Sequence, residues 1–243
     1  MGKRILKIAF IFAIGMAGGI FSSQVILPYF FKDTFLSFDS QYLAKLASGP
    51  IYLTEKKDIT VQENTALQDS IEKVKKSIIG IKTTTKSGKT IYGSGLALTS
   101  DGLIVTFSDV IPRGGEFVFY VEGRAQEYQI LKRDESKNLV LVKLGDNNLV
   151  PCGFADIDGL ELGQRVFLLG AVFENGNMLN EANQGIVKIF TEDYIKTNIL
   201  ESSYFAGSGL FDIKGEVLGL NMIGENGKVT ALPISFIRNF AGL

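Results

Sequence analysis

Residues 195–221 read IKTNILESSYFAGSGLFDIKGEVLGLN, and this segment carries the clearest information about the fold. It holds the apolar run Gly209–Asp212 and most of the run Val217–Met222, with the turn residues Lys214-Gly215 between them. Short apolar runs on either side of turn residues are typical of the two strands of a β-hairpin. The segment therefore predicts antiparallel β-structure at this point of the chain.

The same pattern extends on both sides, from Ser77 to Thr230. Many short strands without helices between them indicate closed antiparallel barrels or a sandwich. A break near residues 146–151 divides the strands evenly, so we predict an all-β fold of two six-stranded antiparallel barrels, with no helix between residues 78 and 232. The predicted strands are Ile78–Thr84, Thr90–Leu98, Leu103–Thr106, Phe117–Val121, Ala125–Lys132, Leu139–Lys143, Arg165–Leu169, Gly185–Phe190, Tyr194–Asn198, Gly209–Asp212, Val217–Met222 and Val229–Leu232.

The region before the strands divides into three parts. Residues 1–31 hold a basic tip and a long apolar segment, and residues 32–63 show no sustained period and are predicted to be a stalk or linker. A short amphipathic helix follows, because Leu67, Ile71 and Val74 recur at helical spacing. We therefore place the folded domain at residues 64–243, with the helix and first barrel in 64–147 and the second barrel and a closing helix in 148–243.

The composition excludes several classes of function. The chain has 243 residues and a net charge of −1, which indicates no basic surface for nucleic acid. It has no histidine, and so lacks both the usual general base at neutral pH and the commonest metal ligand. We therefore expect no Ser-His-Asp or Cys-His mechanism, no metal site and no cofactor. The single Cys152 follows Pro151 in an apolar setting and is interpreted as a buried hydrophobic residue.

The N-terminus has the pattern of an export segment. Lys3, Arg4 and Lys7 precede the uncharged segment Ile8–Phe31, which is long enough as a helix to span a bilayer core. Basic residues before such a segment favour a cytoplasmic N-terminus and an exported remainder. The alternative is a cleaved signal peptide with Ile8–Ile20 as its apolar region. Because apolar residues continue to Phe31, we predict one helix up to that residue, a single-pass membrane anchor, and a barrel domain in the bacterial envelope.

Four segments of the sequence contain motifs that are more specific than the strand pattern. They read YGSGLALTSDGLIVTFSDV at 92–110, RDESKNLVLVKL at 133–144, LELGQRVFLLGAVF at 160–173 and the opening segment at 195–221. In this order and spacing they resemble the HtrA (Deg) branch of the trypsin-like serine proteases, over residues 65–240. The resemblance implies the trypsin-like double barrel, with its site in the cleft between the barrels.

The resemblance also puts other residues at all three positions of the catalytic triad. Asp109 stands at the position of the histidine, Asn138 at that of the orienting aspartate and Ala206 at that of the nucleophilic serine. Alanine has no nucleophile, and asparagine has no imidazolium to stabilise. We therefore expect no catalytic residues in this chain and interpret it as a degenerate member of the family, a pseudoprotease.

Two further residues bear on any remaining activity. The family's oxyanion hole uses the backbone N–H groups of the nucleophile and of a glycine two residues earlier, and Tyr204 stands at that glycine. Ser208 is the alternative nucleophile, although it requires a shift of two residues and a base other than histidine. An active endopeptidase with a non-standard site at Ser208 therefore stays open as an alternative.

A peptide-binding edge is also implied by the resemblance. Trypsin-like domains hold a substrate as an extended strand beside the second barrel. The pairing residues correspond to Met222, Ile223 and Gly224, and the base of the primary pocket corresponds to Leu200, whose side chain suits a small hydrophobic partner. The alternative is that Met222 and Ile223 belong to the barrel core.

Three functions remain after these considerations. The favoured one is a membrane-anchored pseudoprotease outside the cytoplasm that binds extended peptides or an active protease relative. The others are an enzyme with a non-standard site and a structural envelope protein. Relatives in the family usually carry a C-terminal PDZ domain, whereas this chain stops at TALPISFIRNFAGL, so we expect no PDZ domain here.

Overall fold

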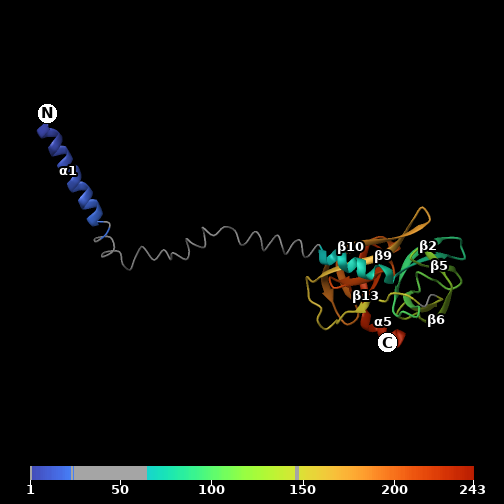
Figure 1. Cartoon of the computed structure of the whole chain (residues 1–243). Coiled ribbons are helices and arrows are strands. Elements are labelled where there is room, and N and C mark those ends of the chain that lie inside the picture. Colours follow the sequence, from blue (N-terminus) through green and yellow to red (C-terminus); the bar gives the residue numbers. More distant parts are fainter. Residues whose placement is uncertain (1, 23, 25–64, 146–147) are drawn as a thin grey trace. The chain divides into compact units, whose positions relative to one another are not determined.

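The computed structural model describes residues 2–22, 24, 65–145 and 148–243. The chain divides into two units, Met1–Thr60 and Val61–Leu243. In the first unit, helix α1 spans Gly2–Phe21 (Figure 1). None of the helices in the described residues combines the length and the apolar character needed to cross a membrane. The last part of the predicted anchor, residues 25–31, and the predicted stalk at 32–63 lie outside the described residues.

The second unit begins with a helix at residues 65–74 that packs on the domain. Leu67 and Ile71 lie against the hydrophobic core, and Val74 is buried in it. On another side of the helix, Ser70 Oγ donates a hydrogen bond to the Ile213 carbonyl over 2.5 Å. A 3₁₀ turn, η2 (Lys75–Ser77), then leads into the first strand. The apolar face of this helix is therefore covered by the domain that follows it.

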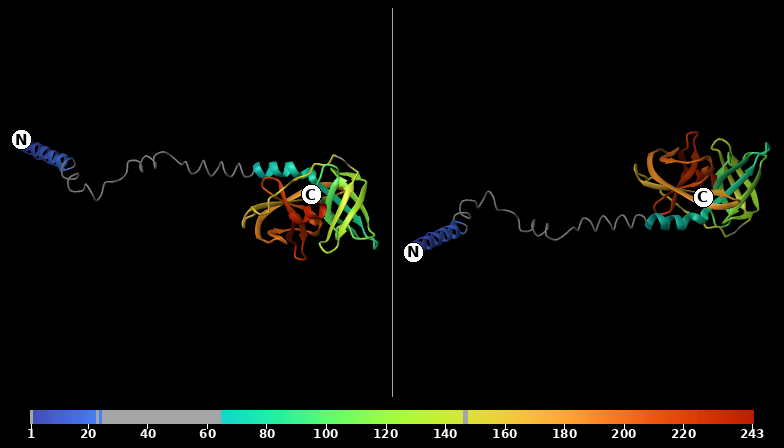
Figure 2. Two further views of the ribbon diagram at one scale, coloured as in Figure 1. Left: turned by 90° about the horizontal axis from the view of Figure 1, so that it is seen from below. Right: turned by 90° about the horizontal axis from the view of Figure 1, so that it is seen from above.

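The first half of the domain is one antiparallel sheet in the order β5-β4-β1-β2-β3-β7-β6. Its outer strands, β5 and β6, are consecutive in the chain, so the sheet curls back on itself into a barrel. Figure 2 draws it in green, next to the second sheet in orange and red. The strands are β1 (Ile78–Thr84), β2 (Thr90–Ala97), β3 (Leu103–Phe107), β4 (Glu116–Val121), β5 (Arg124–Gln126), β6 (Tyr128–Asp134) and β7 (Leu139–Leu144).

The second half is a sheet in the order β12-β9-β10-β11-β14-β13-β8. A further pairing of β12 with β13 closes it, and helix α5 (Ile234–Ala241) follows its last strand. The strands are β8 (Gly153–Phe154), β9 (Arg165–Glu174), β10 (Asn177–Phe190), β11 (Ile195–Leu200), β12 (Gly209–Asp212), β13 (Glu216–Ile223) and β14 (Lys228–Pro233).

The structure corrects the prediction in two respects. Each sheet has seven strands where six were predicted, because the predicted strand Ala125–Lys132 is two strands and β8 was missed. The short β8 also pairs in parallel with β13, so the second sheet is not purely antiparallel. The described part of residues 78–232 contains one short 3₁₀ turn, η3 (Ser203–Phe205), and no α-helix. The all-β architecture of two barrel-like sheets is confirmed.

A shared hydrophobic core holds the two barrels against each other. One cluster of buried side chains includes Ile81 and Phe107 from the first barrel and Phe167 and Phe211 from the second. The rings of Phe167 and Phe211 stack with their centroids 5.3 Å apart. Because one core joins both sheets, residues from the two barrels keep a fixed arrangement where the sheets meet.

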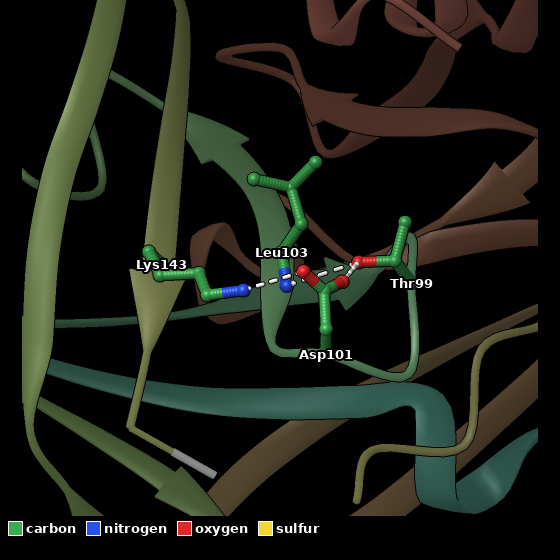
Figure 3. Close-up of polar contacts among 4 residues, drawn as sticks. All are labelled: Thr99, Asp101, Leu103 and Lys143. Atoms are coloured by element: carbon green, nitrogen blue, oxygen red, sulfur yellow. Dashed lines mark hydrogen bonds and ion pairs between the residues drawn. The ribbon is translucent and has the colours of Figure 1, made fainter. Parts of the chain in front are cut away.

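The turn between β2 and β3 is tied to β7 by a small polar network (Figure 3). The Asp101 carboxylate accepts a hydrogen bond from Thr99 Oγ1 and pairs with Lys143 Nζ over 2.6 Å. Thr99 Oγ1 in turn accepts a hydrogen bond from the Leu103 amide over 3.2 Å. The hydrogen bonds from Lys143 and Thr99 hold the pKa of Asp101 below its usual range. This network orders the start of β3, the strand that leads to Asp109.

Candidate functional site

A cavity of about 390 Å³ lies where the two barrels meet. Loops at the ends of strands from both sheets contribute to it, as do strands β2, β3 and β13. Its lining includes the three residues predicted at the triad positions, and these come from both barrels. The lining residues are Ile91, Tyr92, Phe107, Asp109, Val110, Asn138, Ser203, Ala206, Met222 and Ile223. The structure therefore brings Asp109, Asn138 and Ala206 together in one cleft.

Asp109 and Asn138 are joined by two hydrogen bonds. Asn138 Nδ2 donates to the Asp109 carboxylate over 2.7 Å, and the Asp109 backbone N–H donates to Asn138 Oδ1 over 3.2 Å. The family resemblance predicts these two residues at the positions of the histidine and aspartate of a catalytic triad. The chemistry of this pair differs, because neither group is a base that could activate a serine at position 206 as imidazole does.

The loop before β7 positions Asn138. Asp134 accepts hydrogen bonds from Ser136 Oγ over 2.6 Å and from the Lys137 amide over 3.2 Å, and these bonds hold the pKa of its carboxyl below the usual range. Asn138 adopts a left-handed backbone conformation with φ of 58°, which asparagine tolerates better than most residues. Its carbonyl accepts a hydrogen bond from the Ser108 amide over 2.8 Å, next to Asp109.

The turn that carries Ala206 is anchored on β2. The Ser94 amide donates to the Ala206 carbonyl over 2.9 Å, and Ser94 Oγ accepts from the Ala171 amide of β9 over 2.8 Å. Gly207 has a φ of 80°, and a Cβ at this position would collide with the Ser94 carbonyl oxygen. Glycine is therefore required here for two reasons, its backbone conformation and the close approach of β2.

The same turn engages one of the two N–H groups that the resemblance assigns to an oxyanion hole. Residues Ser203–Phe205 form the 3₁₀ turn η3, and the Ala206 amide donates to the Ser203 carbonyl over 3.1 Å. One of the two N–H groups that would stabilise an oxyanion is thus directed into the turn. Tyr204, at the position of the other, is 51% exposed, and its ring lies edge-on to that of Tyr92 with centroids 5.9 Å apart.

Ser208 lies inside the second barrel. Its side chain is fully buried, and its Oγ accepts a hydrogen bond from Asn221 Nδ2 over 3.0 Å. Its backbone also pairs with Asn221, whose amide donates to the Ser208 carbonyl over 2.8 Å. A hydroxyl in this position does not line the cavity, so the structure gives Ser208 a packing role and not the exposed position of a nucleophile.

Of the residues predicted to bind a peptide, some line the cavity and others do not. Met222 and Ile223 are half-buried and line the cavity, and Gly224, which follows them, donates its amide to the Lys228 carbonyl over 3.0 Å. Leu200 does not form the base of a pocket: it is 61% exposed, at an outward position of β11. Alternate residues of β11 face the core, and Leu200 falls on the other face of the strand.

Several lining residues were not identified from the sequence. Tyr92 and Ile91 precede the Gly93-Ser94-Gly95 motif and were interpreted only as strand residues, and Ser203, in the segment 195–221, was given no role. Tyr92 also stacks on Phe173 of β9 with centroids 5.1 Å apart, so its ring belongs to a contact between the barrels. The family pattern gives no signal for these side chains, because it describes the triad positions and their glycines.

The region that contains these residues matches a known protein family. Residues 93–220 match the family model of the trypsin-like peptidase domain, and this region is more than half of the chain. It contains Asp109, Asn138 and Ala206.

Curated relatives carry protease names. A probable periplasmic serine endoprotease DegP-like of Halomonas elongata is 24% identical over 135 residues, 53% of this chain and 28% of the relative. A protein of the same name from Pseudomonas putida (strain F1) is 26% identical over 138 residues, with the same coverage of 53% and 28%. A probable serine protease do-like of Buchnera aphidicola is 25% identical over 162 residues, 60% of this chain and 34% of the relative. The aligned region is thus a minor part of each relative.

Proposed function

This chain belongs to the trypsin-like peptidase family, and we propose that it is a catalytically inactive member that binds extended peptides in the cleft between its barrels. One observation carries the proposal. The cavity that holds Asp109, Asn138 and Ala206 also contains Met222 and Ile223 at the end of β13. A peptide-binding edge therefore adjoins a centre that lacks the groups needed for acyl transfer.

The chemistry of the centre supports inactivity. Ala206 offers a methyl group where the family has its nucleophile, and the chain contains no histidine that could act as general base. The Ala206 amide is already engaged with the Ser203 carbonyl, and Ser208 is buried against Asn221. Nucleophile, base and oxyanion donor are each replaced or occupied, which supports a binding role in place of hydrolysis.

The hydrogen-bonding pattern of β13 supports peptide binding. The Asn221 backbone bonds to Gly207 and Ser208 on the β12 side, and the ladder between β12 and β13 ends at Leu220. On the opposite side, the Gly224 amide bonds to β14. Because backbone groups alternate along a strand, the N–H and C=O of Ile223 are directed to the side where β12 has ended. An extended peptide can add there as a new strand.

Binding of an unfolded chain tests this proposal. We expect the full-length protein, kept in detergent, to raise the fluorescence anisotropy of fluorescein-labelled β-casein without cleaving it. Ile223→Pro removes the N–H at the open edge and should abolish binding, because β-strand addition depends on main-chain hydrogen bonds. Ile223→Ala keeps that N–H and is the matched control, with binding reduced by only a small factor.

The outcomes separate the candidate functions. Absence of binding by the wild-type protein would contradict peptide recognition and would favour a structural role in the envelope. Equal loss of binding in the proline and alanine variants would show that the side chain, and not the open edge, is responsible. Cleavage of casein would favour the alternative of an active endopeptidase.

The proposal includes a location outside the cytoplasm. Lys3, Arg4 and Lys7 before the uncharged segment 8–31 favour export with a cytoplasmic N-terminus, and two of the relatives are named periplasmic. The bound segments would then belong to exported proteins or to an active protease relative. For a retained anchor, we expect full-mass protein in the membrane fraction after carbonate washing. A shortened, released form would contradict anchoring and indicate a cleaved signal peptide.

A further inference from the structure

We infer that the Asp109 carboxylate makes this cleft selective for peptides that carry a lysine or arginine side chain beside the bound strand. The inference rests on the proposed peptide binding and adds the chemical class of the ligand. It gives the residue at the former histidine position a recognition role that the peptidase mechanism does not contain.

The carboxylate is held in a defined orientation. Asn138 Nδ2 donates to one of its oxygens, Oδ2, over 2.7 Å, and the Asp109 amide donates to Asn138 Oδ1 over 3.2 Å. These bonds connect Asp109 to the loop before β7, where the Ser108 amide also bonds to the Asn138 carbonyl. A carboxylate that is fixed before binding loses little side-chain freedom when a cation pairs with it.

The rest of the cavity fits the stem of a basic side chain. Apart from Asp109, Asn138 and Ser203, the lining is apolar or aromatic, with Ile91, Val110, Ala206, Met222 and Ile223 beside Tyr92 and Phe107. Lysine and arginine carry an apolar stem and a cationic head, so they match a cavity with apolar walls and one anionic group. Tyr92 adds an aromatic ring, against which a cation can pack favourably.

Among the ion pairs of the described residues, none involves the Asp109 carboxylate. The cavity lining contains no lysine or arginine. Two cations on neighbouring loops have other partners, since Arg113 Nε pairs with Glu135 over 2.9 Å and Lys137 Nζ lies 4.4 Å from the centre of the Phe236 ring. No cation in the part of the chain that the structure describes is paired with Asp109, so a basic side chain of the ligand can take this place.

The polar side chains of the cavity favour an organic cation over a metal ion. Within the described residues, no three side chains of His, Cys, Asp or Glu gather as they would around a metal ion. A single carboxylate with a neutral amide beside it instead suits one ammonium or guanidinium group, which both can contact through hydrogen bonds.

The experiment compares two peptides that differ in one charge. Each is an extended, end-blocked, fluorescein-labelled peptide, identical except for lysine or norleucine at one position, and that position is moved along the peptide. We expect the full-length protein to bind the lysine peptide about two- to fivefold more tightly at one position, as for an ion pair with an exposed carboxylate. The preference should shrink as salt is raised, because salt screens the attraction.

Asp109→Asn should abolish the preference, so that the variant binds the lysine and norleucine peptides with equal affinity, and an unchanged circular-dichroism spectrum and melting transition report that the variant is folded. Asp193→Asn makes the same charge change on an exposed loop and is the matched control, with the preference retained. If the lysine and norleucine peptides bind the wild type equally at every position, the inference is overturned while peptide binding stands. If neither peptide binds, both the inference and the proposed function fail.

Discussion

Asp109 and Asn138, which the family resemblance aligns with the histidine and aspartate of a triad, are joined by a hydrogen bond between their side chains. In a triad, the histidine at the first position donates to a carboxylate at the second. Here the amide of Asn138 donates to the carboxylate of Asp109. The geometry that positions the two side chains is kept, but no proton can pass through the pair to a nucleophile. In the proposed function, this pair supplies an oriented negative charge and takes no part in proton transfer.

Cys152 provides a test of burial at a single residue. The side chain is buried, and desolvation raises the pKa of its thiol to about 12. Since the thiolate is the reactive form, we expect the folded protein to resist iodoacetamide at pH 8 and to be alkylated rapidly in guanidinium.

The raised pKa of Cys152 also has a consequence for stability. The folded state favours the protonated thiol, so this contribution is complete below the pKa of the unfolded thiol and is lost as pH rises towards 12. Cys152→Ala should therefore weaken the loss of stability above pH 9, as measured by denaturant unfolding. Rapid labelling of the folded wild type would contradict the assigned burial.

The placement of residues in the cleft was predictable where a motif fixes the local spacing. Asp109, Asn138 and Ala206 each lie in a segment anchored by glycines or by a strand, and the structure brings them together. Leu200 does not match its predicted place, because alternation along β11 puts Ile195, Thr197 and Ile199 toward the core and Leu200 on the outward face. The resemblance assigned Leu200 from aligned spacing alone and did not take this alternation into account.

At the scale of elements, the apolar alternation identified the buried strands and missed the exposed ones. The predicted strand Arg165–Leu169 extends in the structure to Glu174, and β10 begins at Asn177 instead of Gly185. Much of this added hairpin is exposed and polar, including the sequence Asn180 to Gln184, so periodicity gives no signal there. Cross-strand pairing, and not burial, makes these residues a strand.

The turn between β2 and β3 gives a prediction on pH. The pKa of Asp101 is lowered by its bonds to Lys143 and Thr99, so its contribution to stability is present above the pKa of the unfolded carboxyl and is lost as pH falls through the folded value. Asp101→Asn should lower the melting temperature at pH 7, with a difference that shrinks towards pH 3. Asp193→Asn, on an exposed loop, is the control, and an equal effect of both variants would contradict this assignment.

The turn formed by residues 203–206 gives a prediction on catalysis. A triple variant restores the triad residues with Asp109→His, Asn138→Asp and Ala206→Ser. In this variant the backbone amide of residue 206 stays hydrogen-bonded to the Ser203 carbonyl in the 3₁₀ turn. Adding Tyr204→Gly relieves that turn. We expect the triple variant to hydrolyse a peptide ester about 10²–10³-fold more slowly than the quadruple variant, the usual effect of one oxyanion donor. Equal rates would show that the hole forms despite Tyr204.

At the scale of the whole molecule, two barrels with one shared core form a cleft to which each barrel contributes different residues. The first barrel supplies Asp109 and Asn138, and the second supplies Ala206 and the open edge at Ile223. The two-barrel fold could be predicted from strand spacing and the four family segments. Half of the cavity lining, namely Asp109, Asn138, Ala206, Met222 and Ile223, was named from the sequence, whereas Ile91, Tyr92, Phe107, Val110 and Ser203 were not, because their positions depend on how the barrels pack together.

The most direct test of the central claim is labelling of the purified full-length protein by a fluorophosphonate probe, read by mass spectrometry alongside hydrolysis of a peptide ester. Loss of a triad leaves at best about 10³–10⁴-fold acceleration over water, below detection in such assays. We therefore predict no labelled serine and no hydrolysis above buffer. Stoichiometric labelling at Ser208 or Ser203, with turnover that disappears on replacing that serine by alanine, would contradict the account.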